Sequence, residues 1–209
     1  MAQFRCQECN ALFDIPRETL DKYPGWTPKF CRKHSPKMAK RGKARPRARE
    51  EHLTLDEVRA KYSAGPQTGV FTDGSSVPNP GPGGWGVVWV VDGEILAQNH
   101  GHAEATTNNR MELQALIEAY KLLPKKEKAT LYTDSRLCVN TINDWAPKWE
   151  DNGWKKKGGE IKNLELVKEL VSIDRAHPHC EIAWIAAHKG NLWNEYADSL
   201  ATAWMRDEL

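Results

Sequence analysis

The chain has 209 residues, a net charge of +2 and a hydrophobic share of 40%, which suits one ordinary domain with a smaller unit attached. No apolar run reaches the roughly 18 residues that cross a bilayer, and the first residues lack the apolar core of a secretory signal, so we expect a cytoplasmic protein with no membrane partner. Five cysteines is an odd number and argues against a disulfide framework.

Two close pairs of metal-ligating residues stand near the start of the chain, with 21 residues between the pairs. The pairs are Cys6 with Cys9 and Cys31 with His34. Four such ligands suit a tetrahedral structural zinc site, and the intervening segment has too few large apolar residues for a core of its own. We therefore expect residues 1–36 to form a zinc-binding module, in which His52 is an alternative to His34 as the fourth ligand.

A basic segment and a short helix are expected next. Residues 37–50 are rich in Lys and Arg and almost free of large apolar side chains, which is typical of a linker. Thr54 and Glu57 form a capping-box pattern that predicts the start of a helix. We assign residues 37–65 to a basic linker with a short helix, and residues 66–209 to the main domain.

The charge is unevenly distributed. The first 50 residues hold 13 Lys and Arg against 5 Asp and Glu, so this part is near +8 and the remainder is near −6. A basic segment tethered to an acidic domain favours sequence-independent attraction to a polyanion such as nucleic acid.

The main domain alternates between strand-like and helical patterns. Three strand-like runs come first, with proline and glycine breaking the chain between the first two and a hairpin turn at Asp92-Gly93. Strands are expected at 69–73, 85–91, 95–102, 129–133 and 181–186, and helices at 109–123, 134–145, 161–173 and 191–205. The order βββαβααβα predicts an α/β domain, a mixed sheet with helices on its faces.

Four acidic residues in this domain occupy inward-facing or strand-end positions. Asp73 and Asp134 each end an apolar run, and they would converge if their strands are parallel neighbours. Glu112 lies in a first helical turn beside the apolar stripe, and Asp198 lies on the small-residue face of the last helix. Taken singly, each acid also has an ordinary structural explanation as a turn former, a helix cap or a helix edge.

Together the four acids point to metal chemistry. Clustered carboxylates repel one another at reduced dielectric, and cations relieve that repulsion. An all-oxygen ligand set selects hard ions such as Mg²⁺ or Mn²⁺. The cluster therefore predicts phosphodiester hydrolysis assisted by two divalent ions.

The acids stand in motifs that closely resemble those of type 1 ribonuclease H, from about Gly69 to Trp204. The motifs are Thr-Asp73-Gly-Ser with Asn79-Pro-Gly-Pro-Gly-Gly, Thr107-Asn-Asn-Arg-Met-Glu112-Leu, Thr-Asp134-Ser, and His188 ahead of Asn194-Glu-x-x-Asp198. The resemblance implies the ribonuclease H-like fold, a mixed five-stranded sheet with flanking helices. It also implies endonucleolytic hydrolysis of the RNA strand of RNA–DNA hybrids, leaving 5′-phosphate and 3′-hydroxyl ends.

Roles follow by position from the resemblance. The catalytic metal ligands would be Asp73, Glu112, Asp134 and Asp198, and His188 would be a mobile histidine that assists proton transfer or product release. The substrate-binding residues would be Asn79, Asn108 and Asn109 on the RNA strand, Thr107 and Asn163 on a phosphate of the DNA strand, and Trp145, Lys155, Lys156 and Lys157 on a basic protrusion.

Some positions keep more than one interpretation. Trp149 and Trp154 of the protrusion either bind the hybrid or pack a helix pair. Three positions differ from the residues that are frequent in the family: Ala105, Arg136 and Leu137. They put the binding of the DNA strand in doubt but do not affect the hydrolytic residues.

Alternatives also remain for the whole chain. The N-terminal segment does not resemble the family's hybrid-binding domain, yet its charge predicts a similar tethering purpose, and a protein partner for it stays open. A monomer is expected. The competing functions are a related nuclease of the same fold, such as an integrase or junction resolvase, and a catalytically inactive hybrid-binding adaptor. The Asn79 loop, the protrusion and the four intact acids argue against both.

Overall fold

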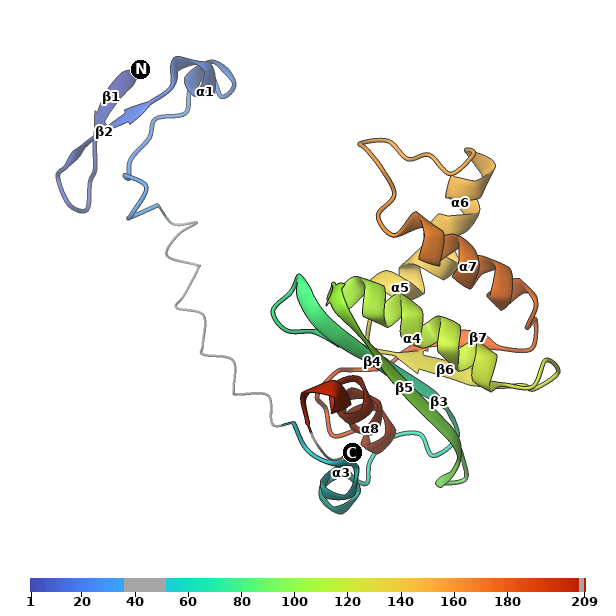
Figure 1. Cartoon of the computed structure of the whole chain (residues 1–209). Coiled ribbons are helices and arrows are strands. Elements are labelled where there is room, and N and C mark those ends of the chain that lie inside the picture. Colours follow the sequence, from blue (N-terminus) through green and yellow to red (C-terminus); the bar gives the residue numbers. More distant parts are fainter. Residues whose placement is uncertain (36–51, 207–208) are drawn as a thin grey trace. The chain divides into compact units, whose positions relative to one another are not determined.

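The chain folds as two compact units, Met1–Glu51 and His52–Leu209 (Figure 1). This computed structural model describes residues 1–35, 52–206 and 209. The basic part of the expected linker, residues 37–51, lies outside the described residues. Among the residues that are described, no helix is long and apolar enough to cross a membrane.

The N-terminal unit is a small hairpin followed by a short helix. Strand β1 (Ala2–Arg5) pairs antiparallel with β2 (Leu12–Ile15), and α1 (Arg17–Asp21) follows. Of residues 1–35, only Cys6 and Pro28 are buried. Residues 1–35 thus have no hydrophobic core, as their composition predicts, and something besides apolar burial must stabilise their fold.

A mixed five-stranded sheet forms the centre of the second unit, as predicted. Its order is β5-β4-β3-β6-β7; β3, β4 and β5 are antiparallel neighbours, whereas β6 is parallel to both β3 and β7. The strands are β3 (Gly69–Ser76), β4 (Gly81–Val91), β5 (Glu94–Thr106), β6 (Thr130–Thr133) and β7 (Glu181–Trp184).

Helices cover both faces of this sheet (Figure 1). Alternation along β3 turns Val70 towards one hydrophobic cluster and Phe71 towards the other. The Val70 side is covered by α4 (Asn108–Leu122) and α7 (Leu164–Arg175), and the Phe71 side by α8 (Leu192–Ala201) and α3 (Leu55–Lys61). Two separate cores therefore stabilise the sheet. The candidate site lies just after the segments of β3 and β6 that pair in parallel, towards their carboxyl ends.

Several element boundaries differ from the sequence-based expectation, and two of these differences have a clear structural cause. Strand β4 begins at Gly81 rather than Trp85, because its glycines allow close approach: a Cβ at Gly84 would lie 2.4 Å from the carbonyl oxygen of Ala201. The helix expected to end at Trp145 instead continues to Asp151 and is interrupted by a π-helical turn, because Pro147 has no amide hydrogen to complete the α-helical bond to the Asn143 carbonyl. Its parts are α5 (Arg136–Asn140), a π-helical turn (Thr141–Trp145) and α6 (Ala146–Asp151).

The short helix α3 is part of the second unit. The predicted capping box is present, since Thr54 Oγ1 accepts a hydrogen bond from the Glu57 amide and the Glu57 carboxylate accepts one from the Thr54 amide. Leu55 and Val58 are buried in the cluster that contains residues of α8. Just before α3, the Leu53 carbonyl accepts hydrogen bonds from Ser199 Oγ at 2.6 Å and from Arg206 Nη1 at 2.9 Å. The folded unit therefore starts before residue 66, where the catalytic domain was expected to begin.

Candidate active site

The parallel pairing of β3 with β6 brings Asp73 and Asp134 together. Thr72 is the register partner of Thr133, and each threonine is followed directly by one of the aspartates. Thr72 Oγ1 also donates to the Tyr132 carbonyl at 3.1 Å. The predicted convergence of the two aspartates follows from this register, although β3 continues past Asp73 instead of ending there.

Glu112 reaches the same place because Gly74 lets helix α4 rest directly on β3. A Cβ at Gly74 would lie 2.2 Å from the Glu112 nitrogen and 2.3 Å from the Met111 carbonyl carbon. Thr133 Oγ1 donates to the Glu112 carboxylate at 3.4 Å. One carboxylate oxygen each of Asp73, Glu112 and Asp134 lies within 4.8 Å of the others.

Asp198 joins the group from the opposite face of the sheet. Gly86 is the register partner of Asp73, and a Cβ there would lie 2.4 Å from the carbonyl oxygen of Ala197. Helix α8 therefore packs closely on β4, and the charge of Asp198 is one of those that raise the pKa of Asp73. Asp198 is outside the tight group of three acids, but it adjoins it.

Burial and mutual repulsion raise the pKa values of three acids in the cluster. Burial, followed by repulsion from Glu112, Asp198 and Asp134, raises the pKa of Asp73 well above its usual value. Burial and the charge of Asp134 raise the pKa of Glu112 in the same way. Burial also raises the pKa of Asp134, against the opposing effects of His188 and a hydrogen bond from Asn194.

This cluster fits divalent cations. Its donors are all carboxylate oxygens, which hard ions such as Mg²⁺ and Mn²⁺ prefer, and cationic charge would relieve the repulsion that raises the pKa values. The residues that could hold such ions are Asp73, Glu112, Asp134 and Asp198.

His188 lies beside the cluster on an exposed loop. Its backbone is in the left-handed region, with φ of 48°, and its Nδ1 is 3.9 Å from Glu195 Oε2. Glu195 is buried, and its other oxygen accepts the Gly190 amide at 3.3 Å. Glu195 was not identified from the sequence, where it is simply the residue after Asn194, because its burial depends on how the loop folds over α8.

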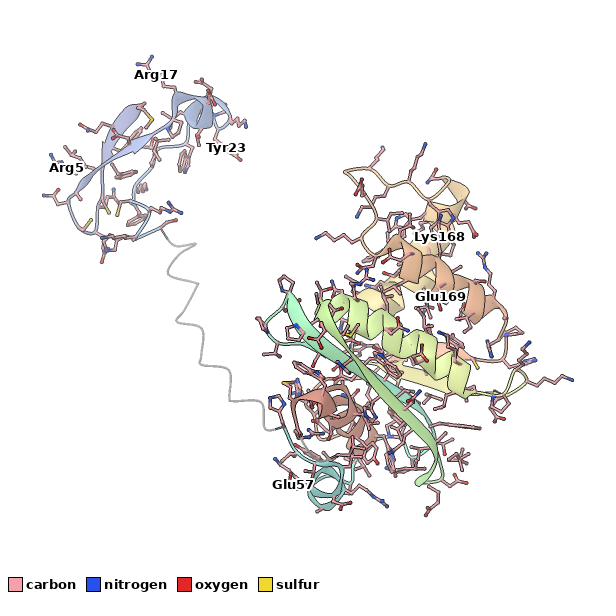
Figure 2. All side chains as sticks on the ribbon, viewed as in Figure 1. Arg5, Arg17, Tyr23, Glu57, Lys168 and Glu169 are labelled. Carbon is pink, nitrogen blue, oxygen red and sulfur yellow. The ribbon has the colours of Figure 1, made fainter. Side chains whose placement is uncertain are left out.

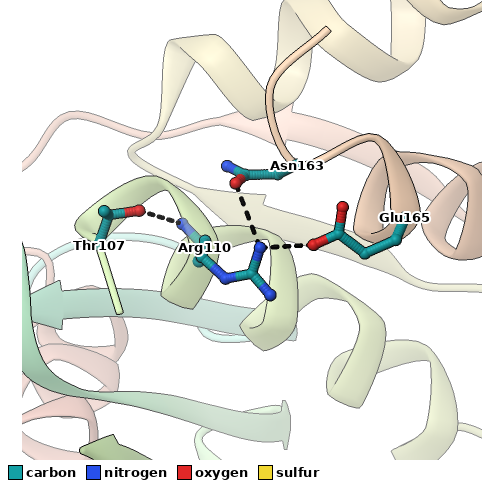
Figure 3. Close-up of polar contacts among 4 residues, drawn as sticks. All are labelled: Thr107, Arg110, Asn163 and Glu165. Carbon is teal, nitrogen blue, oxygen red and sulfur yellow. Dashed lines mark hydrogen bonds and ion pairs between the residues drawn. The ribbon is translucent and has the colours of Figure 1, made fainter. Parts of the chain in front are cut away.

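Thr107 and Asn163, expected to grip a DNA phosphate, lie on either side of Arg110 (Figure 3). Thr107 caps α4 by accepting the Arg110 amide at 3.4 Å, and the Arg110 guanidinium donates to Asn163 Oδ1 at 3.3 Å and to Glu165. The structure thus adds Arg110 to this set as a cation that orients Asn163.

The three asparagines expected on the RNA strand are all exposed. Asn79 Oδ1 accepts the Asn108 amide at 3.3 Å, so the loop before β4 and the start of α4 are joined. Asn109 lies one residue further along the same helical turn.

The expected basic protrusion is formed by α6 and the loop that follows it, which extend beyond α7 in Figure 1. Trp145 is 38% exposed, and Lys155, Lys156 and Lys157 are all exposed. Trp149 and Trp154 instead pack partly buried against the larger hydrophobic cluster. The packing interpretation therefore holds for these two tryptophans.

Arg136 and Leu137, which depart from the family pattern, lie next to Asp134. The Arg136 guanidinium is 4.0 Å from the centre of the Trp184 ring, and Trp184 Nε1 donates to the Asp134 carbonyl at 3.1 Å. Leu137 is 40% exposed. A stacked cation and an apolar side chain thus border the cluster here.

A second cluster lies in the N-terminal unit. One ligand atom from each of Cys6, Cys9, Cys31 and His34 lies within 4.8 Å of the others. The Cys9 and Cys31 sulfurs are 3.8 Å apart, and the Cys31 sulfur is 3.3 Å from His34 Nδ1. A zinc tetrahedron with Zn–S bonds near 2.3 Å has sulfur–sulfur edges of roughly 3.8 Å.

The protonation of Cys6 also suits metal binding. Burial raises the pKa of this thiol, but backbone hydrogen bonds at Cys31, Cys9 and Glu8 outweigh burial and lower the pKa to about 6. The thiolate is the form that binds metal. His34 is the histidine of this cluster.

Known proteins match the second unit. The family model for RNase H matches residues 66–206, about two thirds of the chain. The chain belongs to the RNase H family. Ribonuclease H of Francisella tularensis subsp. novicida is 42% identical over 132 residues, which are 63% of this chain and 86% of that protein. Ribonuclease H of Ehrlichia ruminantium is 46% identical over 133 residues, 63% of this chain and 90% of that one.

A solved structure agrees with these relatives. LC9-RNase H1, a type 1 RNase H with the type 2 active-site motif, has a TM-score of 0.55 and 33% identity over 68% of this chain and 74% of its own. The chain is therefore a ribonuclease H enzyme with the RNase H fold, and that fold implies divalent metal ions at its acidic site. The family match leaves out residues 1–65, so the cysteine cluster is a feature outside the RNase H region.

Proposed function

We propose that this RNase H is an endonuclease that hydrolyses the RNA strand of RNA–DNA hybrids and leaves 5′-phosphate and 3′-hydroxyl ends. The observation that carries the proposal is the convergence of Asp73, Glu112 and Asp134 within 4.8 Å, with Asp198 adjoining. The named ribonucleases H among its relatives support the same activity.

Different side chains would bind the metal ions, transfer protons and bind the substrate. Bound to the four acids, two divalent ions would supply activation of the attacking water and stabilisation of the leaving 3′ oxygen. His188 would exchange a proton beside this site, since its exposed loop leaves the ring accessible. Thr107, Arg110 and Asn163 hold a phosphate of the DNA strand, while Asn79, Asn108 and Asn109 contact ribose hydroxyls.

The decisive experiment is cleavage of a strand-labelled hybrid, beside RNA duplex, DNA duplex and single-stranded RNA, with Mg²⁺. We expect cutting of the hybrid's RNA strand alone, and a loss of about a thousandfold or more for Asp134→Asn because a ligand charge is removed. The matched control is Asp56→Asn, an exposed acid on α3, which should cut normally. Binding of hybrid without cleavage would instead indicate an inactive adaptor, and cutting of DNA a related nuclease.

We propose further that Cys6, Cys9, Cys31 and His34 bind a structural zinc ion and that the N-terminal unit strengthens hybrid binding. The near-tetrahedral spacing of the ligand atoms and the scarcity of buried side chains support zinc as the main stabiliser of this unit. The net charge near +8 in the first 50 residues supports a contribution to nucleic-acid affinity.

Removal of the N-terminal unit should separate binding from catalysis. The purified chain is expected to carry one zinc ion, and Cys9→Ser should lose it. Deletion of residues 1–51 should preserve cleavage at saturating hybrid but weaken binding and flatten its salt dependence, by roughly 0.9 in the logarithmic slope per lost phosphate contact. A salt slope equal to that of the full chain would exclude the unit and its basic segment from binding.

A further inference from the structure

An apolar groove of about 900 Å³ lies on the N-terminal unit, and none of the four zinc ligands lines it. Its walls include the aromatic side chains of Tyr23, Trp26 and Phe30. Tyr23 is 60% exposed and Trp26 is 49% exposed. So much exposed aromatic surface on a small unit indicates a binding surface, because water contact with it is unfavourable.

A tight turn presents the two most exposed rings together. The Trp26 amide donates to the Tyr23 carbonyl at 3.0 Å, and Gly25 between them has φ of +86°, which favours glycine. The ring centres are 6.4 Å apart in an edge-to-face arrangement. Figure 2 shows Tyr23 at the surface, close to α1. This geometry leaves ring surface available to a flat ligand.

The charges around the groove favour an anionic ligand. Lys29 is the charged residue in its wall, and the acids of α1, Glu18 and Asp21, do not line it. Ser35 also lines the groove, and the strongly basic sequence begins two residues later. A ligand with flat aromatic parts and repeated negative charge matches this combination.

We propose that the groove binds unpaired nucleotides of a single strand, whose bases stack against Trp26 and Tyr23 while Lys29 provides a cation for the backbone. Duplex bases have their faces covered by their neighbours, so the groove selects the single-stranded flank of a hybrid. The inference rests on the proposed function, because hybrid cleavage is what brings such a flank to this chain.

The test compares two hybrids that differ only in an unpaired overhang of about eight nucleotides. Full-length protein with Asp134→Asn, which should bind without cutting, is titrated with each by fluorescence anisotropy. We expect the overhang to tighten binding roughly tenfold, and Trp26→Ala in the same background to remove that gain without changing affinity for the blunt hybrid. Tyr23→Ala should reduce the gain, and Trp26→Phe should keep most of it.

Leu12→Ala is the matched control, since Leu12 is 53% exposed on the same unit but outside the groove. Zinc content verifies that each variant keeps its fold, and Tyr23→Ala replaces Trp26→Ala if the latter loses zinc. The inference is overturned if the overhang does not tighten binding. It is also overturned if the gain survives both Trp26→Ala and Tyr23→Ala, which would point to a protein segment as the occupant of the groove, or if these substitutions weaken binding of the blunt and overhung hybrids equally. Failure of the parent chain to cut hybrid would refute the proposed function separately.

Discussion

Asp73→Asn is expected to lower the rate of hybrid cleavage about a thousandfold or more while making the metal-free protein more resistant to heat. The two effects have one cause. Asp73 is buried against Glu112, Asp198 and Asp134, so its charge serves to bind metal and destabilises the fold when metal is absent. Replacement by the neutral amide keeps the shape and removes that repulsion. Activity assays with Mg²⁺ and thermal unfolding in EDTA measure the two effects.

The stability of the metal-free protein should depend on pH for the same reason. The folded-state pKa values of Asp73 and Glu112 are raised, so the folded protein holds these protons more tightly than the unfolded chain does. The resulting stabilisation is complete below about pH 4 and is lost as pH rises through the raised values. Metal-free wild type should therefore lose stability with rising pH more steeply than Asp73→Asn, whereas Asp56→Asn should follow the wild type. Parallel pH profiles for all three proteins would contradict this account.

Gly74→Ala should disable the site without altering any chemical group in it. The new Cβ would lie 2.2 Å from the backbone of Glu112, so α4 must move away from β3 and carry the Glu112 carboxylate with it. We expect a loss of about 1–3 kcal/mol in the free energy of unfolding from overpacking. A displacement on the order of 1 Å at a catalytic group lowers rates about a hundredfold. Chemical denaturation and kcat measured on the folded protein give the two quantities.

Gly93→Ala is the matched control for that substitution. Gly93 lies in the β4–β5 hairpin turn with φ of +82°, and its nearest neighbour to a new Cβ is 3.5 Å away. Alanine there should cost about 1–2 kcal/mol in stability through backbone strain alone and leave kcat unchanged. If Gly74→Ala lowered activity no more than Gly93→Ala does, the close approach of α4 would have no special role in catalysis.

The acidic residues of the site could be predicted from the sequence, whereas the residues that contact His188 and Asn163 could not. Asp73 and Asp134 were recognisable because each ends an apolar run, but only the β3–β6 register shows that they are neighbours. Glu195 and Arg110 were missed as parts of the site, because their roles depend on contacts with His188 and Asn163 that no local pattern encodes. The π-helical turn ahead of Pro147 had a visible signal, since proline removes an α-helical hydrogen bond from the preceding turn.

The contacts ahead of α3 limit where the chain can be truncated without exposing its core. Leu53 is fastened to Ser199 and Arg206 near the carboxyl end of the chain, and Leu55 and Val58 are buried beside α8. A truncation at residue 66, where the family match begins, would remove these contacts and expose the apolar surface of α8 to water. A cut before His52 would preserve these contacts, so a different binding domain could be joined at residue 52 while the catalytic unit keeps its fold.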